Sequence, residues 1–166
     1  MTFAGIISVS ISSNKVLISY RYGNKYIGAY EMNELSSSIS SHVTGIGGVF
    51  FKVEDTELNK NWYRDILGFP INDYGGAEFK FRENDFPETQ GYSVFGIFAS
   101  KTEYFNPSQK EFMINLRVRD LDGLLIKLEK LGINQVGERE SYDYGDFAWI
   151  IDPNGIKLEL WEQKYE

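Results

Sequence analysis

The sequence of 166 residues has no cysteine and only one histidine. The lack of cysteine excludes disulfides, thiolate catalysis, cysteine-ligated zinc and iron–sulfur clusters. With one histidine, His42 is the sole residue from which a serine–histidine–aspartate set could be built. His42 comes just before the first strongly patterned segment, and we expect it to be an exposed linker residue.

Positive charge and long hydrophobic runs are also scarce. The sequence has 17 Lys and Arg residues and 24 Asp and Glu residues, which gives a net charge of −7. An acidic chain without a basic run repels phosphate backbones, so we expect no nucleic-acid partner. No apolar run approaches the length of a membrane span, and residues 1–14 lack the basic start of a signal peptide. We therefore expect a soluble, cytoplasmic protein with no membrane partner.

Residues 1–43 form an N-terminal arm that differs in character from the rest. The β-prone runs 16–22 and 25–30 flank Gly23-Asn24, a pattern that predicts a hairpin. An isolated hairpin is marginally stable in water, and a serine-rich linker follows at 35–41. Three interpretations stay open for the arm: a strand added to the domain, a partner-binding extension, or a poorly ordered tail.

After the arm, one order of elements occurs twice. A strand at 47–53 precedes a helix with Asp55 at its N-cap, and a strand at 112–118 precedes a helix with Asp120 at its N-cap. Both helices are followed by further strands. The apolar residues of the first helix that fall at helical spacing are Leu58, Trp62, Ile66 and Leu67. The repetition predicts an internal duplication in which each helix covers one sheet face and the other face encloses a cup.

These segments resemble the vicinal oxygen chelate superfamily, which groups glyoxalase I, bleomycin-resistance proteins and extradiol dioxygenases. The matching stretches are VED at 53–55, WYRDILG at 62–68, RVRDLD at 117–122 and DPNGIKLELW at 152–161. The resemblance implies an α+β fold of two tandem βαβββ modules, which form a curved mixed sheet with a central cup. The implied domain spans residues 44–166, after the arm, and the bleomycin-resistance branch implies a homodimer.

Catalytic members of this superfamily hold a divalent metal through a His or Glu at four inward-facing strand positions. By resemblance, these positions fall on Gly48, on the segment 96–98, on Met113 and on Glu159. Of these, only Glu159 offers a suitable donor, because glycine has no side chain and a thioether is a poor ligand for hard metals. One carboxylate does not hold a metal against water. We therefore expect no metal and no other cofactor, and the one candidate for a catalytic residue is Glu159.

Alternation along the strands selects the side chains that line the cup. The predicted ligand-binding residues are Phe50, Lys52, Met113, Asn115, Arg117, Trp149, Glu159 and Trp161. The apolar members could instead fill a closed core. Glu159 could act as a general base, bind a cationic ligand, or pair with Arg117 or Lys52. Those two cations could instead grip an anionic group.

Aromatic residues near the loop at Gly145 leave further alternatives open. Trp149, Tyr142 and Tyr144 could stack on a flat ligand, form a lid or make an interface. Our first hypothesis is a binding protein that sequesters or senses a small organic molecule without metal. The alternative is a metal-dependent lyase, isomerase or dioxygenase-like enzyme that uses Glu159, and a third possibility is an interaction module.

Overall fold

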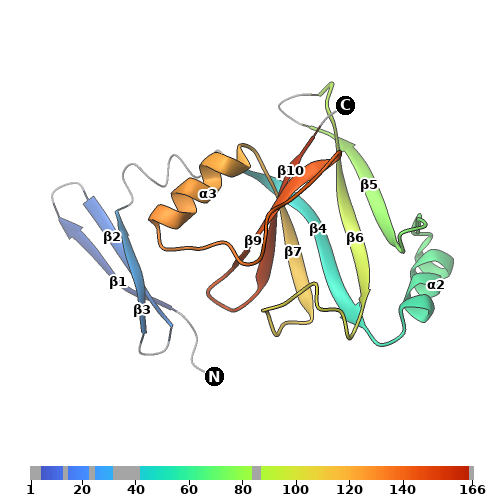
Figure 1. The fold of residues 1–166 in the computed structure, drawn as a ribbon, viewed down its shortest axis with the longest axis horizontal. Coiled ribbons are helices and arrows are strands. Elements are labelled where there is room, and N and C mark those ends of the chain that lie inside the picture. Colours follow the sequence, from blue (N-terminus) through green and yellow to red (C-terminus); the bar gives the residue numbers. More distant parts are fainter. Residues whose placement is uncertain (1–4, 13–14, 23–24, 32–41, 84–86, 165–166) are drawn as a thin grey trace.

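The computed structural model describes residues 5–12, 15–22, 25–31, 42–83 and 87–164. The three N-terminal strands are β1 (Gly5–Ser12), β2 (Lys15–Tyr22) and β3 (Lys25–Glu31) (Figure 1). They form their own antiparallel sheet in the order β1-β2-β3. The predicted pairing of 16–22 with 25–30 is confirmed, and these strands do not extend the sheet of the domain. The turn Gly23-Asn24 and the serine-rich linker lie outside the described residues.

The remaining elements build an α+β unit around one sheet, as predicted. In chain order they are β4 (Val43–Val53), α2 (Thr56–Leu67), β5 (Gly76–Arg82), β6 (Gln90–Ala99), β7 (Phe112–Val118), α3 (Leu121–Lys130), β8 (Glu140–Tyr142), β9 (Gly145–Ile151) and β10 (Lys157–Gln163). The sheet has the order β5-β6-β4-β7-β10-β9-β8 and curls into a half-barrel (Figure 1). Among the described helices, none is long and apolar enough to cross a bilayer.

The two predicted halves are arranged symmetrically about the centre of this sheet. β4 and β7, the opening strands of the halves, pair antiparallel. Each opening strand also pairs in parallel with the closing strand of its own half, β4 with β6 and β7 with β10. β8 of the second half has no full strand as its counterpart among the described residues of the first half. Its counterpart there is a single β-bridge between Ile71 and Ala77. The closing strand of each half thus lies beside its opening strand, where inward-facing side chains of both can meet.

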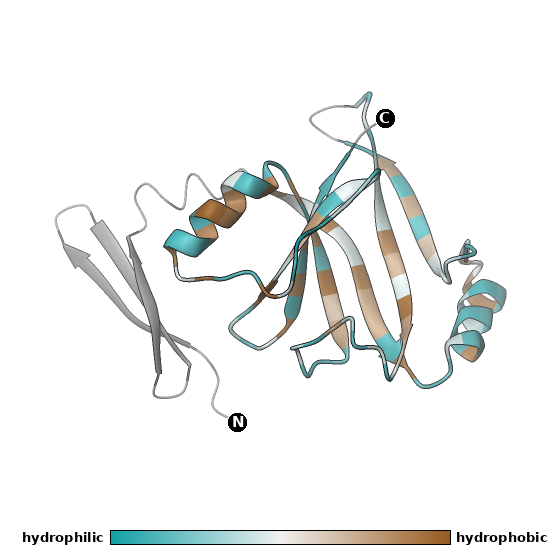
Figure 2. Ribbon diagram, in the orientation of Figure 1, coloured by the Kyte–Doolittle hydropathy of each residue, from teal (hydrophilic) through white to brown (hydrophobic). Residues whose placement is uncertain are grey.

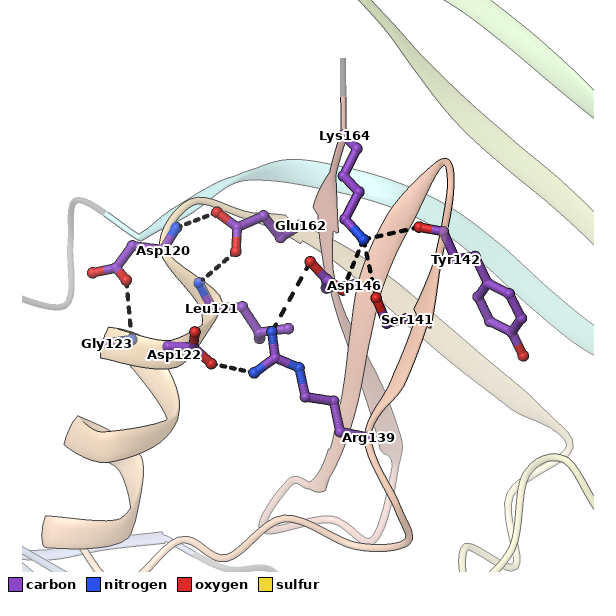
Figure 3. Close-up of polar contacts among 10 residues, drawn as sticks. All are labelled: Asp120, Leu121, Asp122, Gly123, Arg139, Ser141, Tyr142, Asp146, Glu162 and Lys164. Atoms are coloured by element: carbon purple, nitrogen blue, oxygen red, sulfur yellow. Dashed lines mark hydrogen bonds and ion pairs between the residues drawn. The ribbon is translucent and has the colours of Figure 1, made fainter. Parts of the chain in front are cut away.

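Local sequence signals set the ends of both helices. The Asp55 side chain accepts from the Leu58 backbone N–H at 2.9 Å, and Gly68 ends α2 with a φ of 68°. At α3, the Asp120 side chain accepts from the Gly123 N–H at 3.1 Å. The carboxylate of Glu162 in β10 also accepts from two N–H groups at the start of α3 (Figure 3). This contact fixes α3 to the closing strand.

The helices pack on the convex side of the sheet in different ways. α3 contributes hydrophobic residues (Figure 2) to a buried cluster with the outward-facing residues of three strands. The members of this cluster are Val118, Leu121, Leu124, Leu128, Ala148, Ile150 and Leu160. α2 instead packs through the ring of Tyr63. The centroid of this ring lies 4.8 Å from that of Phe95 and 6.3 Å from that of Phe51. The apolar stripe by which α2 was predicted is at least half exposed at Leu58, Trp62, Ile66 and Leu67.

The expectation that His42 is an exposed linker residue is wrong. Its side chain is buried at the start of the domain. Nδ1 lies 2.8 Å from the Arg119 carbonyl oxygen, and Nε2 lies 2.5 Å from Nζ of Lys127. An ammonium group only donates, so Nε2 accepts and Nδ1 donates its proton to the carbonyl. His42 therefore links β7 and α3 to the beginning of β4.

Candidate functional site

The predicted site residues lie on the concave side of the sheet, opposite the helices. In the parallel pair of β7 and β10, Asn115 is level with Glu159 and Arg117 is level with Trp161. Alternation therefore places these four side chains on one face. They are buried together with Phe50, Met113 and Trp149, each of the seven at most 8% exposed. Lys52, the remaining member, is partly exposed. Ligand contact by these eight residues stays a prediction.

Glu159 is 2% exposed and is held by three neutral donors. The Asn115 amide donates to Oε1 at 2.6 Å, and the Trp149 indole N–H donates to Oε2 at 2.9 Å. The Tyr104 hydroxyl also donates to Oε2, through a short hydrogen bond. A buried carboxylate needs such donors, because leaving it without them costs several kcal/mol.

The two cations that the sequence offered as partners of Glu159 have other contacts. Arg117 forms a buried ion pair with Glu83 and lies 4.5 Å above the Phe81 ring centroid. The Lys52 ammonium lies 5.2 Å from the ring centroid of Phe105. The expectation of a structural pair between Glu159 and either cation is thus wrong. β5 and the segment after it supply the partner of Arg117, and nothing in the residues around Arg117 signals this.

A third cation, Lys157, lies closer to the carboxylate network. Its ammonium donates to the Tyr104 carbonyl at 2.6 Å and faces the rings of Tyr104 and Trp149, 5.1 and 5.0 Å from their centroids. Burial lowers the pKa of Lys157, and the nearby Glu159 opposes this shift. Burial, followed by the charge of Glu159, raises the pKa of Tyr104. The Tyr104 hydroxyl therefore keeps its proton and acts as a donor to Glu159.

These residues do not fit the divalent metal that the superfamily implies. At the position of Gly48, an added Cβ would lie 2.5 Å from the Val94 backbone oxygen, so no ligand side chain fits there. Met113 is fully buried, and both oxygens of Glu159 already accept hydrogen bonds. Within residues 42–83 and 87–164, no three His, Cys, Asp or Glu side chains gather as a metal site. The donor set is that of a carboxylate held by neutral hydrogen bonds.

Three site residues keep a buried polar atom without a hydrogen-bond partner: Oδ1 of Asn115, Nε of Arg117 and Nε1 of Trp161. Unpartnered buried polar atoms are rare, since each costs about 1–3 kcal/mol. Asn115 and Arg117 occupy neighbouring inward-facing positions of β7, and Trp161 is in register with Arg117. Oδ1 of Asn115 is packed against Gly47, and none of the three residues lines the pocket at the β8–β9 hairpin.

Beside this network lies an open pocket of about 240 Å³ at the β8–β9 hairpin. Its lining residues are Tyr104, Glu140, Tyr142, Tyr144 and Phe147. Tyr104 connects the pocket to Glu159 through its hydroxyl. Two of the three aromatic residues that we singled out near Gly145, Tyr142 and Tyr144, line this pocket. The third, Trp149, faces Glu159 inside.

The sequence did not direct us to Tyr104, Glu140 or Phe147 as site residues. Tyr104 and Phe105 lie in the connection between β6 and β7, and Phe105 is fully buried. Their signal was an aromatic pair in an otherwise polar segment, which indicates a loop that packs inward. Glu140 is opposite Phe147 in the β8–β9 pair, a register that becomes visible only once the hairpin is formed.

Comparisons with known proteins agree with this fold. A family model, the Glyoxalase/Bleomycin resistance protein/Dioxygenase superfamily, matches residues 42–160. The chain belongs to this superfamily, as its sequence motifs suggested. The comparison with curated proteins gave no match.

Solved structures of this superfamily share the architecture. A single-residue variant of methylmalonyl-CoA epimerase from Streptomyces coelicolor has a TM-score of 0.53 at 16% identity, over 74% of this chain and 99% of that one. The 2,3-dioxygenase LapB of Pseudomonas sp. KL28 has a TM-score of 0.50 at 19% identity, over 75% and 42% of the two chains. At these identities the likeness shows the fold alone.

Proposed function

We propose that this chain binds a small organic molecule at the concave side of its sheet, without a metal, and so sequesters or senses it. One observation carries the proposal: an open, aromatic-walled pocket adjoins a buried carboxylate whose oxygens are occupied by neutral donors. Pockets that combine aromatic walls with a few convergent polar groups suit small organic ligands. The Glu140 carboxylate and the tyrosine hydroxyls of the lining support a ligand with polar groups.

The alternative is a metal-dependent lyase, isomerase or dioxygenase-like enzyme that uses Glu159. The superfamily includes enzymes, and similar folds are those of an epimerase and a dioxygenase. A metal at Glu159 would require at least two further donors beside it. The neighbours of Glu159 are instead an amide, an indole and a phenol, each of which donates a proton to it. The donor set therefore favours binding over metal-assisted catalysis.

The proposal also includes the oligomeric state and the cellular location of the protein. The resemblance to the bleomycin-resistance branch supports a homodimer, and the composition supports a cytoplasmic location without nucleic-acid or membrane partners. Light scattering on the purified full-length chain tests the dimer, with twice the 19.1 kDa chain mass as the expected result.

A thermal-shift screen of the full-length protein against a diverse set of small organic molecules tests the function. A ligand at a hundred times its Kd adds about 2.7 kcal/mol to the free energy of unfolding, which raises Tm measurably. The same shift is expected in Trp62→Ala, because Trp62 is a half-exposed aromatic residue of α2, on the convex side of the sheet. In Tyr144→Ala, which lacks one wall of the pocket, the shift should be reduced.

Two outcomes of this screen contradict the proposal. If no compound raises Tm, the chain is an interaction module rather than a small-molecule binder. If added divalent metal raises Tm in the wild type but not in Glu159→Gln, Glu159 coordinates a metal and the enzyme alternative is favoured.

A further inference from the structure

Two exposed rings, Tyr142 and Tyr144, and the buried ring of Phe147 form one side of the pocket. The rings of Tyr142 and Tyr144 stack with centroids 5.3 Å apart and planes within 1° of parallel. The Phe147 ring meets both at an angle, 6.0 Å from Tyr142 at 66° and 5.8 Å from Tyr144 at 67°. The rings therefore make two walls set at an angle, and the faces of aromatic rings carry negative potential.

One carboxylate lies among these rings. Glu140 is level with Phe147 in the β8–β9 pair, and its Oε2 accepts from the Tyr142 hydroxyl at 2.6 Å. This contact fixes the carboxylate beside the ring of Tyr142. The five lining residues thus combine four aromatic rings with one negative charge and contain no cationic side chain.

The charged groups behind the pocket leave its surroundings negative overall. Tyr104 separates the pocket from Glu159, to which its hydroxyl donates. The Lys157 ammonium lies against the Tyr104 ring and offsets one carboxylate. Glu140 and Glu159 carry two negative charges against this single positive one, which leaves a net negative charge facing the pocket. An anionic ligand would be repelled here, whereas a cation would gain from both the charge and the rings.

The pocket wall is also held in place from its other side. Alternation turns Ser141 and Asp146 away from the rings, toward a charged cluster (Figure 3). There, Lys164 contacts Asp146 at 3.1 Å, the Ser141 hydroxyl at 3.0 Å and the Tyr142 carbonyl at 2.9 Å. Arg139 joins Asp146 to Asp122 of α3. A wall that is ordered before binding loses less conformational entropy when a ligand arrives.

We infer that this pocket recognises an organic cation, a quaternary ammonium or a protonated amine, through its rings and Glu140. The inference rests on the proposed function, since it names the chemical class of the molecule bound at the same site. Four aromatic side chains with one carboxylate are the chemistry that favours such cations over uncharged molecules of equal shape.

Calorimetric titration of the full-length protein with choline and with 3,3-dimethylbutan-1-ol tests the inference. The second compound replaces the ammonium nitrogen by carbon and keeps the shape. The expected result is that choline binds about tenfold more tightly than the alcohol, from cation–π attraction and Glu140 together. Choline should bind about threefold more weakly to Glu140→Gln and about threefold more weakly to Tyr144→Leu.

Two matched variants serve as controls. Glu138→Gln removes the same charge from an exposed residue outside the pocket, and Trp62→Leu removes a half-exposed aromatic ring on the convex side of the sheet. Both should bind choline as the wild type does. If Glu138→Gln weakens binding as much as Glu140→Gln does, the preference reflects the overall net charge of −7 and the inference is overturned.

Failure of the inference is distinguishable from failure of the proposed function. If the alcohol binds as tightly as choline, the pocket takes small molecules but does not select cations. If neither compound binds while the thermal-shift screen yields other ligands, the cation inference is overturned and the proposed function stands. If neither compound binds and the screen yields no ligand, both are overturned.

Discussion

The side chain of Glu159 combines burial with charge, and its three donors explain how the fold accommodates it. Hydrogen bonds to a charged group contribute about 1.5–3 kcal/mol each, more than those between neutral groups. The donors come from three places far apart in sequence: Tyr104 from the connection before β7, Asn115 from β7 and Trp149 from β9. Glu159 therefore organises the interior as well as facing the site.

Removal of one donor tests this role. Tyr104→Phe deletes only the hydroxyl that donates to Glu159, and it should lower the free energy of unfolding by about 1.5–3 kcal/mol. Urea denaturation measures the change. As a control, Tyr63→Phe on the convex side should cost less than about 0.5 kcal/mol. Equal losses of unfolding free energy in the two variants would contradict a specific stabilising role of the hydrogen bond to Glu159.

Gly47 is a second residue on which the site depends. A Cβ at this position would overlap Oδ1 of Asn115, so Gly47→Ala must displace the amide that donates to Glu159. We expect a loss of about 1–3 kcal/mol in the free energy of unfolding. At Gly45, a Cβ meets only the end of the Arg117 side chain, at 3.1 Å. Gly45→Ala should thus cost clearly less, and a reversed order of the two variants in denaturation would contradict this packing.

At the scale of elements, the β8–β9 hairpin depends on its charged cluster. The hydrogen bond from Ser141, then Lys164 and Arg139, hold the pKa of Asp146 below its ordinary value of 3.8. A carboxyl with a lowered folded pKa adds stability above its unfolded pKa, and this stability is lost as the pH falls through the folded value. The cluster should therefore weaken in acid.

Denaturation of the wild type and Asp146→Asn between about pH 6 and pH 3 checks this dependence. The wild type should be the more stable of the two at pH 6, and the difference should shrink toward pH 3. Asp73→Asn, in an exposed turn, controls for the general loss of a carboxylate. A difference that grows on acidification would contradict the sign.

Some features of the helices and strands were predictable from local sequence patterns, and others were not. The caps at Asp55 and Asp120 and the alternation along β7 and β10 were predictable, because they depend on neighbours a few residues away. The orientation of α2 was not. Its apolar stripe is exposed, and Tyr63 packs instead against Phe51 and Phe95. Helical spacing defines a stripe, but the sheet selects the side that packs.

Within the site, the face of each residue was predictable and its partner was not. Alternation correctly placed Asn115, Arg117 and Glu159 on one face. The partners Glu83 and Tyr104 come from connecting segments, whose path the sequence pattern does not fix. The same holds for His42, whose contacts with Arg119 and Lys127 lie 77 and 85 residues away.

At the scale of the whole molecule, the separate N-terminal sheet supports a prediction about folding. β1, β2 and β3 pair with one another, so a chain that starts at residue 42 should retain the cooperative unfolding of the full-length protein. A chain that starts at residue 44 lacks the buried His42 and its two contacts. It should lose about 1–2 kcal/mol relative to the longer fragment. Calorimetric melting of both fragments and the intact chain provides the test, and equal stabilities of the two fragments would contradict the role of His42.

We propose that the buried Glu159 carboxylate, which accepts hydrogen bonds from three neutral donors, coordinates no metal. Calorimetric titration of the metal-stripped full-length protein with Zn²⁺, Mn²⁺ and Ni²⁺ tests it most directly, with Glu159→Gln as the matched variant. We expect the wild type and the variant to give the same heats, with no stoichiometric metal site in either. One tightly bound ion per chain in the wild type, lost in Glu159→Gln, would contradict it.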